Sequence, residues 1–196
     1  YEMSASLVGS EMCIRDRALI NTSEKTRKHC MQLENCVYDF FELTTLNMAQ
    51  KGLFGEVLHV EGSYIHNLEE FWPYYWNNWR LDYNREFRGD VYATHGLGPA
   101  CQLLNIHRGD RMKTLVAMDT KAVTGPELVK QYQKEEAPDF QNGDHTMTFI
   151  RTENGKTIHI QHDVMNPRQP YVSADRYQRF CQQISHRAIL FPPGSD

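Results

Sequence analysis

The chain has 196 residues, of which 40% are hydrophobic and 23% charged, with a formal net charge of −4. This length and composition fit one globular domain and exclude a disordered chain, and no apolar run approaches the roughly 20 residues of a membrane-spanning helix. The slightly acidic balance and the scattered basic residues give no reason to expect nucleic acid, so we expect neither a nucleic-acid nor a membrane partner.

The first part of the chain predicts two helices and two strands. Residues 21–29 are typical of a helix end, and residues 29–36 of a short strand leading into a turn. Apolar residues recur at helical spacing over residues 40–49, and Gly52 marks the end of that helix. Residues 53–65 alternate in the manner of a strand. This strand–helix–strand order indicates an α/β or α+β domain.

Residues 66–90 have no clean period and predict an elaborated loop. Seven aromatic residues crowd between Phe71 and Tyr83. They can stack on the faces of sugars, with Arg80 as a hydrogen-bonding fork, or they can anchor the loop to a core. The sequence leaves both interpretations open.

The rest of the chain predicts a helix that begins near Thr94, a strand over residues 111–123 and a polar surface connection over residues 125–144. Residues 144–164 alternate on both sides of Asn154 and Gly155, which is the pattern of a β-hairpin. The predicted fold class is therefore α/β (α+β), with a largely antiparallel open sheet that has helices on one side.

No familiar nucleotide, phosphate, zinc or serine-nucleophile motif occurs. In GDVYATHGLGP, Tyr92 and His95 lie where a loop becomes a helix, between glycines that let a ligand approach the backbone. A phenol and an imidazole together suit proton transfer near neutral pH, although a histidine at a helix start can also be structural.

Other candidate groups carry weaker signals. Loop carboxylates that could form a two-acid glycosidase pair are Glu69, Glu70, Asp82 and Asp90, but such carboxylates are usually solvated. His159 and His162 are three apart on a predicted strand and so face opposite sides, which makes a metal site there unexpected. The five cysteines have neither disulfide nor metal spacing and are best interpreted as buried or incidental thiols.

Three stretches carry a resemblance to a known family. Residues 29–83, with the motifs LENC and GSYIHN, residues 89–123, with GDVYATHGLGP, and residues 139–168, which end in MNPR, resemble bacterial NAD-dependent α-N-acetylgalactosaminidases. That family is a glycosidase branch of the glucose-fructose oxidoreductase and inositol dehydrogenase superfamily. The resemblance runs nearly without a break from Ala18 to Arg168 and implies a Rossmann domain followed by a substrate domain with an open sheet.

The resemblance also implies a mechanism that needs no carboxylate pair. Tightly held NAD oxidises C3 of the sugar, which acidifies the C2 proton so that a modest base can remove it. The glycosidic oxygen then leaves by elimination, water adds, and the hydride returns. The net reaction is hydrolysis of terminal α-N-acetylgalactosamine, and NAD is the expected cofactor.

The residues that match the family's functional positions are Asn35 for the cofactor and Tyr64, Arg80, Tyr92, Ala93, Thr94, His95 and Tyr171 for the substrate. His95 and Tyr92 are the expected proton-transfer residues, and their individual roles stay open. Tyr171 is the nearest candidate for a tyrosine that follows the MNPR motif, at a point where the sequence departs from the family pattern.

Both ends of the chain depart from the family. LVGSEMCIRDR resembles a translated sequencing adapter, so we expect residues 1–17 to be non-native, and residues 169–196 to be a frameshifted tail, with a divergent natural tail as the alternative. We expect residues 18–52 to be a Rossmann remnant with its connection and residues 53–168 an incomplete substrate domain.

We therefore expect this chain to be a fragment of a glycosidase, and we expect the fragment on its own to be inactive. The alternatives are a sugar oxidoreductase of the same superfamily and an inactive, truncated glycan-binding domain. The resemblance leaves open a homo-oligomer formed through the sheet face. It assigns no localisation to this chain, although family members are often exported.

Overall fold

The computed structural model describes residues 17–31, 33–69, 71, 79–133 and 140–165, together with the backbone of residues 178–184. Residues 1–33 and 34–196 are separate units. The described part of the first unit holds a helix over residues 17–26, close to the predicted helix end. In the described part of the chain, no helix combines the length and apolar character needed to cross a membrane.

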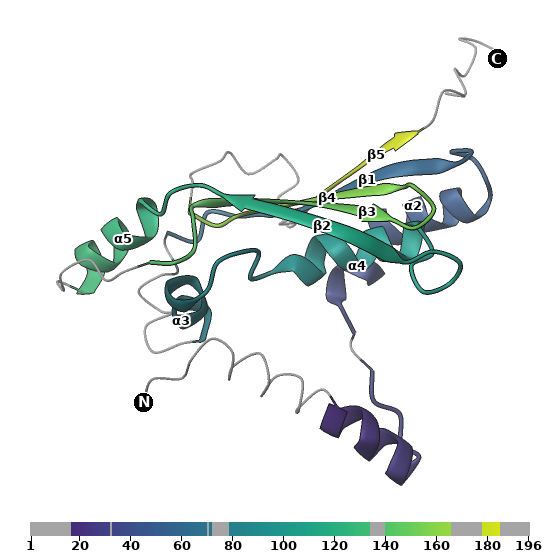
Figure 1. Cartoon of the computed structure of the whole chain (residues 1–196), viewed down its shortest axis with the longest axis horizontal. Helices are drawn as coiled ribbons and strands as arrows, with labels where there is room; N and C mark the ends of the chain where they lie inside the picture. The colour runs from purple at the N-terminus through teal and green to yellow at the C-terminus, as the bar shows by residue number, and fades with distance from the viewer. Residues whose placement is uncertain are drawn as a thin grey trace. The chain divides into compact units, whose positions relative to one another are not determined.

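The second unit is a mixed α/β structure (Figure 1). Its elements, in chain order, are η1 (Asn35–Tyr38), α2 (Phe40–Gln50), β1 (Val57–Ile65), α3 (Trp79–Glu86), α4 (Ala93–Leu103), β2 (Met112–Asp119), α5 (Thr124–Gln133), β3 (His145–Thr152), β4 (Thr157–Asp163) and β5 (Gln178–Ile184).

The strands form one sheet in the order β2-β3-β4-β1-β5. Every neighbouring pair is antiparallel except β1 and β4, which run parallel. The predicted hairpin is confirmed as β3 and β4, and Gly155 in its turn has a φ of 82°, a conformation that favours glycine. The expectation of a largely antiparallel sheet is confirmed.

Helix α4 packs on one face of the sheet and carries the main core with it (Figure 1). Side chains that fill this core include Val60, Ile158 and Ile150 from three adjacent strands and Ala100 and Leu104 from the helix side. The opposite face of the sheet carries Phe149, which is stacked on His159 at 4.2 Å between ring centroids. His159 and His162 therefore lie on opposite faces, as the strand period predicts.

Three predicted elements differ from the structure. The described residues between 29 and 36 form no strand, because a strand needs a neighbour for its backbone hydrogen bonds and those residues have none in the sheet. The predicted loop over residues 66–90 contains α3, and the predicted surface connection contains α5. Helix α5 is amphipathic and buries Leu128 and Val129 in a second apolar cluster, a signal hidden by its polar composition.

Candidate active site

Helix α4 crosses β1 where two glycines meet. A Cβ atom on Gly62 would lie 2.6 Å from the carbonyl oxygen of Gly96, so only a residue without a side chain fits. Tyr64 follows Gly62 by two residues and shares its face of the strand, and His95 directly precedes Gly96. The glycine contact therefore sets Tyr64 beside His95, with 5.1 Å between ring centroids and 18° between the ring planes.

The rings of Tyr64, Tyr92, His95 and His162 form a stacked group. Tyr64 lies 4.4 Å from Tyr92 between ring centroids, and Tyr92 lies 5.6 Å from His162. His162 enters this group because β4 pairs with β1 in the register that sets it opposite Tyr64. A ring group of this kind offers a flat, partly apolar wall with polar edges.

A carboxylate orients His95. Glu34 Oε1 lies 2.7 Å from His95 Nδ1, and its other oxygen, Oε2, accepts the backbone N–H of Val37 at 2.9 Å. An ionised carboxylate is only an acceptor, so Nδ1 carries the proton that it donates to Glu34. In the neutral form of the imidazole, this arrangement leaves the lone pair of Nε2 available to accept a proton.

Cys36 completes the group around His95 Nδ1. Its Sγ lies 3.3 Å from that nitrogen, and the residue is buried. Burial and, to a smaller extent, the neighbouring Glu34 carboxylate together raise the pKa of the Cys36 thiol to about 12. The thiol is therefore protonated near neutral pH and is a poor nucleophile.

His162 is a buried, neutral histidine behind the tyrosines. It is 1% exposed, and neither ring nitrogen has a hydrogen-bond partner among the described residues. Burial lowers its pKa to about 4, so it carries no charge at neutral pH.

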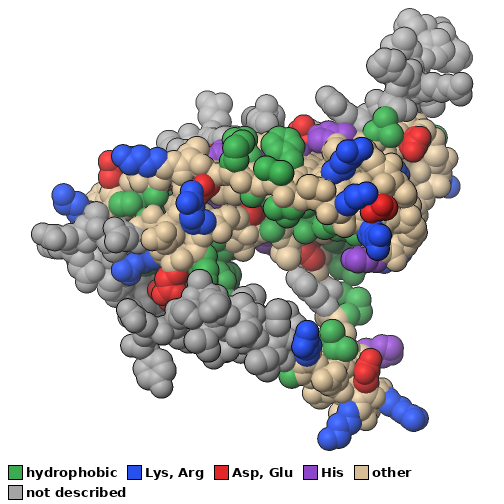
Figure 2. Space-filling view, viewed as in Figure 1, with side chains coloured by type: hydrophobic (Ala, Val, Ile, Leu, Met, Phe, Trp, Pro, Cys, Tyr) green, Lys and Arg blue, Asp and Glu red, His purple; other side chains and the backbone are tan. Residues whose placement is uncertain are grey.

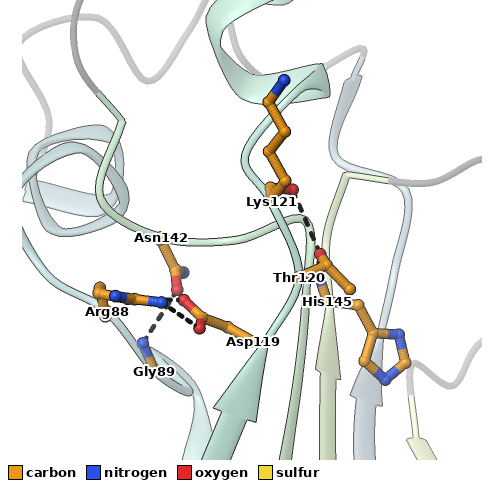
Figure 3. A network of polar contacts seen from close by, with 7 residues as sticks. All are labelled: Arg88, Gly89, Asp119, Thr120, Lys121, Asn142 and His145. Carbon is orange, nitrogen blue, oxygen red and sulfur yellow. Dashed lines mark hydrogen bonds and ion pairs between the residues drawn. The ribbon is translucent and has the colours of Figure 1, made fainter.

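Hydrogen bonds connect the turn that leads into α4 to the end of β2 and to the segment before β3. Arg88 Nε donates to Asp119 Oδ2 at 2.9 Å, and the Gly89 N–H donates to Asn142 Oδ1 at 3.0 Å (Figure 3). The same view shows the His145 N–H donating to Thr120 Oγ1, which joins the end of β2 to the start of β3. These contacts hold the segment just before Tyr92.

A pair of buried amides extends this support to α3. Asn142 Nδ2 donates to Asn84 Oδ1 at 2.9 Å, and Asn84 Nδ2 donates to the carbonyl of Arg80 at 2.8 Å. The Arg80 guanidinium lies over the Trp79 ring, 4.5 Å from its centroid, and that ring packs against Tyr92 at a tilted 6.4 Å. Arg80 thus adjoins the ring group through Trp79.

Asp90 begins the turn into α4. Its Oδ1 accepts the backbone N–H of Tyr92 at 2.8 Å, which fixes the residue before the helix starts. Burial raises the pKa of Asp90 to about 6. Of the other loop carboxylates, Asp82 is exposed on α3, Glu69 is partly buried, and Glu70 lies outside the described residues.

The structure gathers most of the predicted site residues at one place. Tyr64, Tyr92 and His95 are in contact, Ala93 and Thr94 form the first turn of α4, and Asn35 is exposed on η1, which packs against α4. Tyr171 lies outside the described residues.

Sequence reasoning missed Glu34, Cys36 and His162 as members of this group. Glu34 and Cys36 flank Asn35 in LENC, but their contact with a histidine about 60 residues later follows only from the packing of η1 on α4. His162 had a usable signal, because its strand period places it on the same face as the apolar Ile158 and Ile160.

Comparisons with known proteins identify the family of the chain. The family model "Glycosyl hydrolase 109, C-terminal domain" matches residues 38–180. A "Glycosyl hydrolase family 109 protein 1" of Phocaeicola vulgatus is 99% identical over 154 residues, which are 79% of this chain and 32% of that protein. The protein of the same name from Bacteroides thetaiotaomicron is 77% identical over 165 residues, 81% of this chain and 35% of that protein. The chain thus spans about a third of the length of these relatives.

Solved structures show the same fold at low sequence identity. An NAD binding oxidoreductase from Klebsiella pneumoniae is similar with a TM-score of 0.55 and 16% identity, over 78% of this chain and 38% of that chain. An NAD-binding protein from Listeria innocua is similar with a TM-score of 0.51 and 17% identity, over 84% of this chain and 40% of that chain. The described residues therefore share the fold of a part of each of these two proteins.

Proposed function

The chain belongs to glycosyl hydrolase family 109, and from this we propose that its residues form the sugar-binding part of an NAD-dependent glycosidase that releases terminal α-linked N-acetylgalactosamine. The observation that carries the proposal is the Glu34–His95 hydrogen bond beside the stacked Tyr64 and Tyr92. This arrangement provides an oriented imidazole base and a phenol, which are the groups that removal of a carbon-bound proton and protonation of a leaving oxygen require.

The residues around His95 fit a nicotinamide cofactor on the η1 side. Asn35 is exposed there, and its carboxamide can both donate and accept hydrogen bonds, as a nicotinamide amide requires. NAD, when bound, would supply reversible hydride transfer at C3 of the sugar, which makes the C2 proton acidic. Asn35 is the described residue that we propose to hold it.

We assign the proton at C2 to His95. Glu34 holds Nδ1 and leaves Nε2 to accept the proton, and the same carboxylate stabilises the imidazolium that results. Tyr92 is the proposed donor to the leaving oxygen, since a phenol carries its proton at neutral pH. Tyr64 and Arg80 position the sugar by stacking and hydrogen bonding.

Substitution of His95 tests this assignment. In the full-length Phocaeicola vulgatus relative, His95→Ala should lower kcat on an aryl α-N-acetylgalactosaminide by at least about 10²-fold, because a positioned base contributes that much. His59→Ala, at a histidine that bonds Thr157 in the sheet, is the control and should retain turnover. Near-normal kcat in His95→Ala would show that His95 is structural.

A second candidate is a sugar oxidoreductase, which the shared fold with the Klebsiella pneumoniae oxidoreductase favours. Such an enzyme would release NADH in proportion to sugar consumed. A glycosidase that recycles its cofactor would release free sugar with no net NADH. Absorbance at the NADH band during turnover separates the two.

A further inference from the structure

Glu34, Cys36 and His95 bring three different ligand types to one point. One ligand atom from each residue, a carboxylate oxygen, a thiol sulfur and an imidazole nitrogen, lie within 4.8 Å of one another. Glu34 Oε1 lies 2.7 Å from His95 Nδ1, and Cys36 Sγ lies 3.3 Å from the same nitrogen. Thiolate, imidazole and carboxylate are the set that zinc prefers in proteins.

The spacing suits a tetrahedral ion after a small adjustment. Zinc bonds of about 2.0–2.3 Å at tetrahedral angles place the ligand atoms about 3.3–3.7 Å apart. The sulfur–nitrogen distance must widen by about 0.2 Å and the oxygen–nitrogen distance by about 0.6 Å. Glu34 has the rotatable bonds to do this.

Neighbouring groups hold the proposed ligands in place, as hydrogen bonds to the ligands commonly do in metal sites. The Val37 N–H fixes the Glu34 carboxylate through Oε2, at 2.9 Å. Gly98 of α4 has no side chain, and a Cβ there would lie 3.4 Å from Glu34 Oε2 and 3.0 Å from Val37. The side chain of His95 is 24% exposed and that of Glu34 10%, so solvent can reach the group and supply a fourth ligand.

We propose that Glu34, Cys36 and His95 form a binding site for a zinc-like divalent cation whose occupancy blocks proton transfer by His95. When the cation binds, the Cys36 thiol releases its proton to solvent and ligates as a thiolate, and the imidazole proton moves from Nδ1 to Nε2 because Nδ1 then binds the cation. His95 can no longer accept a proton from the sugar. The inhibitory consequence rests on the proposed function, whereas binding of the cation does not.

Cobalt binding to the purified 196-residue chain tests the site, with Co²⁺ as a coloured substitute for zinc. The expected result is one equivalent of Co²⁺ with a thiolate-to-cobalt charge-transfer band that Zn²⁺ removes. Cys36→Ser and His95→Gln should each weaken binding at least about 10-fold. Cys101→Ser is the matched control, because Cys101 is a partly buried thiol of α4 outside this cluster, and it should bind as the parent does.

Two results of the cobalt titration would contradict the proposed site. No charge-transfer band in the folded parent chain, or an undiminished band in Cys36→Ser, would overturn the site. If either variant loses its far-UV circular dichroism, Glu34→Gln replaces it, because this change is nearly isosteric and should weaken binding in the same way.

A second measurement addresses inhibition. Zn²⁺ should inhibit the full-length relative reversibly, with release by a chelator, and the inhibitory concentration should rise at least about 10-fold in Cys36→Ser. Cobalt binding without inhibition of an active enzyme would overturn the inhibitory role alone. An enzyme without glycosidase activity would instead count against the proposed function.

Discussion

At the scale of single residues, His162 shows most clearly what burial does to a titratable group. Its two ring nitrogens lack hydrogen-bond partners among the described residues, and burial lowers its pKa from 6.5 to about 4. A buried polar group without partners costs stability, so its position behind Tyr64 and Tyr92 calls for a reason. We infer that the neutral ring packs against Tyr64 and Tyr92 without adding a charge to the proposed sugar site.

This shift predicts a loss of stability in acid. Below about pH 6.5 the unfolded chain protonates this histidine while the folded chain does not, so the free energy of unfolding falls until pH reaches about 4. His162→Phe keeps an aromatic ring and removes the titration. Between pH 7.5 and pH 5, the parent should lose about 2 kcal/mol more than the variant in urea unfolding.

The free energy of unfolding of the parent must be compared with that of His162→Phe, because Asp90 changes it in the opposite direction as pH falls. Burial raises its pKa to about 6, so the folded chain binds this proton first and gains stability as pH falls from 6 towards 3.8. That contribution is common to the parent and His162→Phe and cancels in their difference. Equal acid losses in both proteins would contradict the assignment to His162.

At the scale of elements, the contact between β1 and α4 determines whether the site forms. Gly62→Ala would place a methyl group 2.6 Å from the backbone oxygen of Gly96, and the backbone cannot yield as a side chain can. The variant should lose about 1–3 kcal/mol in urea unfolding. Gly98→Ala is the control, since its new methyl meets the Val37 side chain at 3.0 Å, and it should lose less. An unchanged midpoint for Gly62→Ala would refute this packing argument.

Elements with a strong local period were predictable from the sequence, and elements fixed by distant contacts were not. The hairpin of β3 and β4 followed from alternation around Asn154 and Gly155, and α2 from apolar spacing that ends near Gly52. Helix α3 lies in an aromatic block without a clean period, so its register depends on packing through Leu81 and Asn84. The predicted strand before Cys36 failed because local propensity alone provides no neighbouring strand.

The site itself was predictable only in part. The resemblance identified Tyr64, Tyr92 and His95, and the structure shows that they touch. The partner that orients His95 could not be predicted, because Glu34 reaches it through the packing of η1 on α4 and not through any spacing in the sequence.

At the scale of the whole molecule, the sheet face opposite α4 carries apolar side chains that are exposed in the described part of the chain. Val116, Met118 and Phe149 are 57%, 60% and 47% exposed there, and Figure 2 shows hydrophobic side chains at the surface over the sheet. Exposed apolar groups in contact with one another mark association surfaces. We propose that this face joins two copies of the chain.

Light scattering of the purified chain tests this association. The parent should have a molar mass above that of the monomer, and Val116→Lys should shift it to the monomer because a charge then enters the apolar contact. Leu53→Lys, at an exposed leucine outside the sheet, should leave the mass of the parent unchanged. A monomeric parent at about 100 μM would contradict the proposed interface.

We propose that the full-length enzyme removes the C2 proton of an N-acetylgalactosaminide before the glycosidic bond breaks. The most direct measurement is hydrolysis of an aryl α-N-acetylgalactosaminide in D₂O by the full-length Phocaeicola vulgatus relative, followed by mass and NMR spectra of the released sugar. Removal and return of that proton through His95 predicts deuterium bound to carbon at C2. Released N-acetylgalactosamine with ordinary hydrogen at C2 would contradict the mechanism.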